Sequence, residues 1–122
     1  MENYRGVSMK EIKAVVQTSR LQKIHDAFHV LKEFPGMVSI RANWSSAHER
    51  KAGTVKEELT DFTRKALIFI VAPDEAVDEI LRVLIDSTST GQTSDGYIWV
   101  TDVGEAFRIC DGRECRPVPQ NT

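Results

Sequence analysis

The polar segment between residues 87 and 96 holds the groups best suited to binding an anion. It contains two turn-forming dipeptides, Thr90-Gly91 and Asp95-Gly96. Glycine lets the backbone turn tightly and bring its N–H groups against a phosphate, and Arg108 could add a forked cation from further along the chain. The same dipeptides are common in ordinary polar turns. Taken alone, the segment fits either a phosphate site or a simple turn.

A second group with ligand chemistry is the pair His25 and His29. Their four-residue spacing places both imidazoles on one face of a helix, where they could share a metal ion. Asp26 and Glu33 are close in the sequence, but nothing fixes a third ligand. The alternative is two polar residues on a solvated helix face.

No residue spacing indicates catalysis. The sequence offers neither a nucleophile with a neighbouring base and orienting acid nor a Walker-type glycine–lysine loop. The adjacent carboxylates Glu57 and Glu58 belong to a charged segment, where solvation explains them better than acid–base chemistry. We therefore expect a binding protein and not an enzyme.

Length and composition limit the class of protein. The 122 residues suit one domain, and 41% hydrophobic with 28% charged residues is typical of a globular chain. A net charge of -2 gives no long-range attraction to a polyanion, so we expect no nucleic-acid partner. No apolar run is long enough to cross a bilayer, and residues 1–10 lack the apolar core of a secretory signal. The cytoplasm is the expected compartment.

The elements that must position these groups follow from hydrophobic periodicity and β-branched runs. Strands are predicted over residues 12–16, 37–44, 66–72, 97–101 and 106–110. One helix is predicted to start at Ser19 as a capping residue and to end near residues 34–36, and a second starts at Pro73. A long polar loop at about 45–60, a loose extension or tag at 1–8 and a tail at 115–122 complete the chain.

This order predicts an α+β fold, a ferredoxin-like βαββαβ sandwich with an extra C-terminal strand. Both helices would cover one face of an antiparallel sheet. Residues 66–72 are apolar at every position, so this strand needs burial on both faces. We therefore expect the opposite face to be buried against other copies of the chain.

From residue 9 to residue 114 the chain resembles the PII (nitrogen regulatory) signal-transduction family. Four segments carry the resemblance: residues 9–14, residues 71–75, the turn with Thr90-Gly91 and Asp95-Gly96, and residues 104–109. The resemblance implies a homotrimer with adenine-nucleotide sites between subunits, and a loop at 45–60 that docks on a regulated partner, often a membrane transporter. The nucleotide-binding residues it implies are Thr90, Gly91, Gln92, Thr93, Ser94, Asp95, Gly96, Arg108 and Val38.

The chain departs from the family where positive charge usually lies. Tyr97, Cys110 and Gln92 stand where relatives usually carry a lysine, an arginine and a lysine. Each lost charge-assisted contact is worth about 1.5 to 3 kcal/mol, so we expect ADP or AMP to bind better than ATP. The loop at 45–60 lacks a tyrosine for uridylylation and the family's glycine-rich entry. These departures resemble a divergent PII-like branch linked to inorganic-carbon uptake and carboxysomes, with bicarbonate as a possible second effector.

Cys110 and Cys115 loosely resemble the C-terminal cysteine pair of PII-like regulators of bicarbonate transporters, in which a disulfide responds to redox state. The alternative is that Cys110 packs as a small hydrophobe in the last strand and Cys115 is an exposed bystander. Two other functions stay open. One is a metal-tolerance protein that binds cations through His25 and His29, and the other is a trimeric scaffold without ligand.

Overall fold

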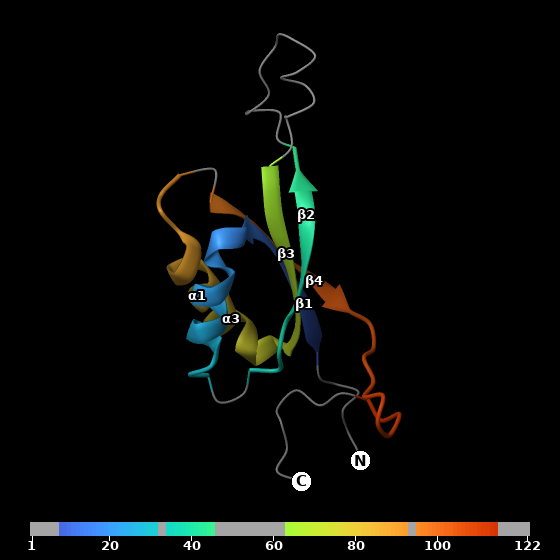
Figure 1. Ribbon diagram of the computed structural model, residues 1–122. Helices are drawn as coiled ribbons and strands as arrows, with labels where there is room; N and C mark the ends of the chain where they lie inside the picture. Colours follow the sequence, from blue (N-terminus) through green and yellow to red (C-terminus); the bar gives the residue numbers. More distant parts are fainter. Residues whose placement is uncertain (1–7, 32–33, 46–62, 93–94, 115–122) are drawn as a thin grey trace.

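The computed structural model describes residues 8–31, 34–45, 63–92 and 95–114, which form one antiparallel sheet with two helices on one face (Figure 1). In chain order the elements are β1 (Met9–Gln17), the 3-10 turn η2 (Thr18–Arg20), α1 (Leu21–Phe28), β2 (Val38–Trp44), β3 (Thr63–Pro73), α3 (Asp74–Thr88) and β4 (Gly96–Val103). The strand order is β2-β3-β1-β4. The predicted ferredoxin-like α+β arrangement is confirmed.

The core lies between the sheet and the helices, because alternate residues of the two central strands point to that face. Ile12, Ala14 and Val16 of β1 pair with Ile70, Ile68 and Ala66 of β3, and all six are buried. The helices supply the other side of the core, with Ile24 and Phe28 from α1 and Ile80 and Leu84 from α3. Apolar residues that alternate along the strands thus pack against apolar residues that recur every three to four positions along the helices, and together they form one apolar layer.

The first helix is shorter than the sequence predicts. It ends at Phe28, whereas the apolar periodicity predicted an end near residues 34–36. The N–H of Leu31 bonds to the carbonyl of Phe28 at 3.0 Å, an i to i−3 contact, so the chain leaves α geometry there. The predicted cap at Ser19 is also wrong. Ser19 lies inside η2, and α1 has Arg20 as its N-cap with no side-chain cap bond.

The second helix begins where predicted, and an ion-pair network anchors its start. Pro73 is the N-cap in extended conformation, and Asp74 and Glu75 lie in the first turn, where negative charge complements the helix dipole. The Nζ of Lys10 in β1 lies 2.9 Å from Asp74 Oδ1 and 3.0 Å from Asp102 Oδ1 in β4. Hydrogen bonds to these two carboxylates raise the pKa of Lys10. One ammonium group therefore joins β1, α3 and β4.

The predicted strand at residues 106–110 is wrong. Phe107 makes only an isolated bridge to Glu114, and a turn lies between them. The N–H of Gly112 bonds to the carbonyl of Arg108 at 2.8 Å, and Gly112 has a φ of 69°. This turn folds the chain back before residues 106–110 can pair with the sheet. Ile109 at its tip is 100% exposed, so alternation of residue types here does not reflect burial.

Within residues 8–31, 34–45, 63–92 and 95–114, no element covers the face of the sheet opposite the helices. It carries Val38 and Ile40 of β2, Leu67, Phe69 and Val71 of β3, and Tyr97 and Trp99 of β4, which share this face by register. Five of these seven are large hydrophobic side chains at least 36% exposed: Val38, Ile40, Val71, Tyr97 and Trp99. We call this surface the open face. The ion pair of Glu11 and Lys13 in β1 lies on the same face by register, beside these apolar side chains. Exposed large hydrophobic residues gathered on one face are typical of an association surface.

If the core is assigned correctly, replacing isoleucine by alanine should lower the free energy of unfolding much more at a buried position than at an exposed one. Ile24→Ala removes a fully buried side chain from the helix–sheet layer and is expected to lower the free energy of unfolding by about 2–5 kcal/mol. Ile109→Ala, at a fully exposed position, is expected to change it by less than about 0.5 kcal/mol. Urea unfolding followed by circular dichroism checks both. Equal costs would contradict the assigned core.

Candidate functional site

The turn between α3 and β4 brings the end of a helix against the start of an edge strand. Thr88 closes the helix by donating its hydroxyl to the carbonyl of Leu84 at 2.7 Å, and the N–H of Ser89 bonds to the carbonyl of Ile85 at 2.8 Å. The chain then turns and enters β4 at Gly96. Of the predicted nucleotide-binding residues in this turn, Thr90, Gly91, Gln92, Asp95 and Gly96 are described, and Thr93 and Ser94 lie outside the described residues.

The carboxylate of Asp95 holds the turn together. Its Oδ1 accepts the hydroxyl of Thr90 at 2.6 Å, and its Oδ2 accepts the N–H groups of Thr90 at 2.6 Å and Gln92 at 3.2 Å. The bond from the Thr90 hydroxyl, followed by that from the Thr90 N–H, lowers the pKa of Asp95. In this conformation the anion at the turn amides is therefore the protein's own carboxylate. Asp95 and Thr90 set the shape of the turn.

Gly96 allows an unusually close approach of β4 to β1. It has a φ of 129°, and a Cβ built on it would lie 1.9 Å from the carbonyl oxygen of Val15. No larger residue fits without moving the backbone of one strand. Gly91 differs, because its φ of 85° favours glycine but the space around it is open. Gly96 is therefore required for the close backbone contact between the strands, and Gly91 for the left-handed backbone conformation in the turn.

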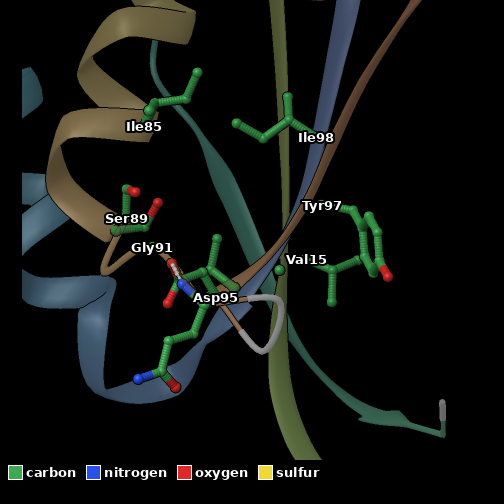
Figure 2. Close-up of a pocket in the computed structure, with 11 residues that line it drawn as sticks. Val15, Ile85, Ser89, Gly91, Asp95, Tyr97 and Ile98 are labelled. Atoms are coloured by element: carbon green, nitrogen blue, oxygen red, sulfur yellow. Dashed lines mark hydrogen bonds between the residues drawn. The ribbon is translucent and has the colours of Figure 1, made fainter. Parts of the chain in front are cut away.

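A pocket of about 400 Å³ lies at this junction (Figure 2). We call it the turn pocket. Its lining comes from the end of β1, the end of α3, the turn and the start of β4: Val15, Val16, Ile85, Thr88, Ser89, Gly91, Gln92, Asp95, Gly96, Tyr97 and Ile98. Figure 2 shows Ile85 and Ile98 on one side of the turn and Tyr97 on the other, with Asp95 and Gly91 in the turn itself. Apolar walls with polar groups at one end suit a flat ring that carries a polar substituent.

The turn pocket has no cation of its own among the residues that line it in the described chain. Asp95 is the one ionised side chain in that lining. Tyr97, half exposed, stands where positive charge was expected from the resemblance, and its ring lies 5.5 Å from the ring of Trp44. Ligands with several negative charges therefore meet little compensation from this subunit.

Two predicted site residues lie away from the turn pocket. Val38 is in β2, and β2 and β4 form opposite edges of the sheet. Arg108 lies in the hairpin after β4, where its guanidinium pairs with the carboxylate of Asp111. The Arg113 N–H, and then the Arg108 side chain, lower the pKa of Asp111. A single subunit does not bring Val38 and Arg108 to the turn.

A second pocket, of about 620 Å³, was not predicted from the sequence. It is lined by Thr18, Leu21, Arg41, Ala42, Asn43, Arg64 and Lys65. The register of β2 with β3 pairs Arg41 with Ala66 and Asn43 with Arg64, so both arginines lie on the same face. Arg41 lies within the predicted strand 37–44 and Arg64 precedes the predicted strand 66–72, so only the register of the two strands brings them together. Here, and not in the turn pocket, the paired strands concentrate positive charge.

The structure bears on the predicted metal ligands and on the predicted cysteine pair in different ways. Among the described residues there is no group of three or more His, Cys, Asp or Glu that could hold a metal ion. Cys110 is exposed in the hairpin turn and does not pack in a strand, contrary to the alternative considered above. Cys115 lies outside the described residues, so the disulfide remains a prediction.

The sheet order, the two helices on one face and the turn that leads into β4 define a ferredoxin-like α+β domain. Residues 9–113 match the family model described as Nitrogen regulatory protein P-II, and the chain belongs to that family. It is 30% identical over 111 residues to nitrogen regulatory protein P-II 1 of Escherichia coli K12, covering 87% of this chain and 96% of that one. The P-II protein of Azospirillum brasilense is 28% identical over the same coverage.

A solved structure shows the same fold. A crystal structure of Arabidopsis thaliana PII bound to citrate superposes with a TM-score of 0.73 at 20% identity, covering 92% of each chain. In keeping with the family, the chain is a regulatory protein that takes part in signal transduction. No helix in the described parts of the chain combines the length and apolar character that a membrane crossing requires.

Replacing Gly96 tests the close approach of β4 to β1. Gly96→Ala places a methyl group against the Val15 carbonyl and in an unfavourable φ region, so we expect a loss of about 1–3 kcal/mol in the free energy of unfolding. Gly104→Ala is the matched control, because nothing lies within 4 Å of its added Cβ. Urea unfolding of both variants gives the comparison. A Gly96→Ala protein as stable as Gly104→Ala would contradict the geometry.

The lowered pKa of Asp95 makes one part of the stability depend on pH. Because the folded-state pKa lies below the unfolded value, the stabilisation is present above about pH 4 and is lost as pH falls through the folded pKa. Asp95→Asn is therefore expected to be less stable than the wild type at pH 7, with the difference shrinking toward pH 3. Asp86→Asn, on the exposed side of α3, controls for removal of a charge. Urea titrations between pH 3 and pH 7 measure the difference in the free energy of unfolding between the wild type and Asp95→Asn. A difference that stays constant with pH would contradict this prediction.

Proposed function

We propose that this chain is a trimeric PII-type regulator that binds an adenine nucleotide, ADP or AMP in preference to ATP, in the turn pocket at a subunit interface. The observation that carries the proposal is the turn from Thr90 to Gly96. Asp95 fixes its shape through three hydrogen bonds, and it borders a pocket with apolar walls. Membership of the PII family supports the reading of this pocket as a ligand site.

The lining of the pocket favours a base and few phosphates. Ile85 and Ile98, on the helix side of the sheet, offer apolar contact to a flat ring, and Ser89 and Gln92 offer polar groups. Each added phosphate brings negative charge toward Asp95 without a cation in the same lining. Repulsion therefore grows from AMP to ATP. This ordering agrees with the absence of the usual lysines at positions 92 and 97 of the sequence.

A neighbouring subunit would supply what one chain lacks. Val38 and the turn lie at opposite edges of one sheet, so a second copy placed edge to edge could bring its β2 beside the first copy's β4. Its Arg108 could then leave Asp111 for a phosphate, because both groups are exposed. Burial of the open face would provide the driving force. Trimerisation and ligand binding are coupled in this proposal.

The regulated partner is proposed on the resemblance alone. We propose that the protein acts in the cytoplasm on an inorganic-carbon (bicarbonate) transporter or a carboxysome-linked protein. Bicarbonate is the proposed second effector. The loop at 45–60 that would contact the partner lies largely outside the described residues. We assign no catalytic role, and the proposed output is a change in the partner's activity.

Calorimetric titration with AMP, ADP and ATP tests the nucleotide proposal. We expect binding of AMP and ADP, weaker binding of ATP, and a loss of about 10- to 100-fold in ADP affinity in Arg108→Ala, since a charge-assisted contact is worth about 1.5–3 kcal/mol. Arg113→Ala, in the same hairpin, is the matched control and should bind as the wild type does. Light scattering on the same samples reports the assembly.

Two outcomes would overturn the proposal in different ways. A trimer that gives no heat with any adenine nucleotide would refute the ligand and leave a scaffold. A monomer that binds ADP with full affinity would refute the interfacial site. Equal loss in Arg108→Ala and Arg113→Ala would show that the hairpin, and not the Arg108 guanidinium, is what matters.

A further inference from the structure

His25 and His29 form a closely opposed pair of imidazoles at the C-terminal end of α1. Their Nε2 atoms lie 3.1 Å apart, and the ring centroids are 4.3 Å apart at an interplanar angle of 72°. The backbone supports this arrangement, because the N–H of His29 bonds to the carbonyls of His25 and Asp26, both at 3.2 Å. Both side chains are exposed. The two rings share a hydrogen bond whose donor depends on their tautomers, and this contact places two ligand nitrogens side by side at the end of the helix.

The separation of the two nitrogens matches what one metal ion requires. At metal–nitrogen distances of 2.0–2.1 Å, two ligands are about 2.9 Å apart at a right angle and about 3.3 Å apart at the tetrahedral angle. The 3.1 Å separation lies between these values. We propose that His25 and His29 bind one divalent transition-metal ion, Cu²⁺, Ni²⁺ or Zn²⁺, with water completing the coordination.

The surroundings of the pair suit a cation. Nδ1 of His25 lies 3.6 Å from Oδ1 of Asp26, and that carboxylate accepts a hydrogen bond from Nε2 of Gln22 at 2.9 Å. At 3.6 Å this contact is too long for a hydrogen bond, so the carboxylate contributes negative charge beside the imidazole without orienting the ring. The carbonyl end of a helix also favours positive charge. Charge and spacing thus agree on a metal ion.

Two ligands from one chain set the selectivity. No third His, Cys, Asp or Glu joins the pair within the described ranges, so the site is open and water-exposed. Imidazole ligands suit Cu²⁺, Ni²⁺ and Zn²⁺, and at such a site the order of affinity follows the general series, with Cu²⁺ the tightest. Mg²⁺ and Ca²⁺, which prefer oxygen ligands, are not expected to bind here.

The site is separate from the turn pocket and from the open face. The turn pocket is lined by β1, the end of α3, the turn and β4, and α1 contributes nothing to it. The helices cover the face of the sheet opposite the open face (Figure 1). Association of copies through the open face therefore leaves the histidine pair accessible. Metal and nucleotide binding can be measured independently.

Titration with CuCl₂ and ZnCl₂, followed by calorimetry and by electron paramagnetic resonance of the Cu²⁺ form, tests the proposal. The variants are built on a Cys110→Ser, Cys115→Ser background so that thiols do not compete. We expect one ion per chain with nitrogen hyperfine structure from two imidazoles. His25→Ala and His29→Ala should each weaken binding at least tenfold, whereas His48→Ala, at the third histidine, should not. The melting temperature should rise with metal only when both His25 and His29 are present.

Three results would show that His25 and His29 do not form the metal site. Unchanged affinity in the His25→Ala, His29→Ala double variant, or loss of binding in His48→Ala alone, would overturn the assignment. Absence of stoichiometric binding to the wild-type chain would do the same. Both histidines are exposed, so the variants should fold, which circular dichroism verifies. ADP titration of the same variants should be unaffected, so failure of this site and failure of the nucleotide proposal remain distinguishable.

Discussion

The close pairing of β1 with β4 is the constraint on which the rest of the structure depends. β1 lies in the middle of the sheet, between β3 and β4, and its residues supply both the core face and the open face. Gly96 starts β4 where a side chain would collide with the Val15 carbonyl. The turn from α3 must therefore arrive at one fixed point, and the turn pocket forms where the helix end meets that point. Hydrophobic packing places the helix, but backbone contact places the turn.

Sequence patterns predicted the four strands of the sheet and the buried faces of the helices, and failed at the end of the first helix and after β4. The strand at 66–72 and the apolar stripes of the two helices, with Ile24 in α1 and with Ile80 and Leu84 in α3, were predictable because apolar periodicity records which face is covered. Residues 106–110 also have the residue pattern of a short strand, yet the chain turns back at Gly112 and Ile109 remains exposed. The early end of α1 belongs to the same class of error, because local hydrogen bonds at Phe28 and Leu31 outweigh the pattern.

The site was predictable in position but not in its electrostatics. Thr90, Gly91, Gln92, Asp95 and Gly96 do gather at one pocket, as turn chemistry suggested. That Asp95 turns inward and binds the turn amides depends on side-chain direction, which residue type does not reveal. Likewise, Arg41 and Arg64 are distant in sequence and share a pocket only through the register of β2 with β3. Charge distribution in this fold is decided by strand pairing.

The Lys10 ammonium joins the start of α3, at Asp74, to the far part of β4, at Asp102. From there, fourteen helical residues rise about 21 Å to Thr88, and six strand residues extend about 20 Å back to Gly96. The ion pairs and the turn pocket therefore lie at opposite ends of the same two elements. Because β4 is paired with β1 along its whole length and Ile80 and Leu84 of α3 are buried in the core, the ends that border the pocket are held in place between the ion pairs and the turn.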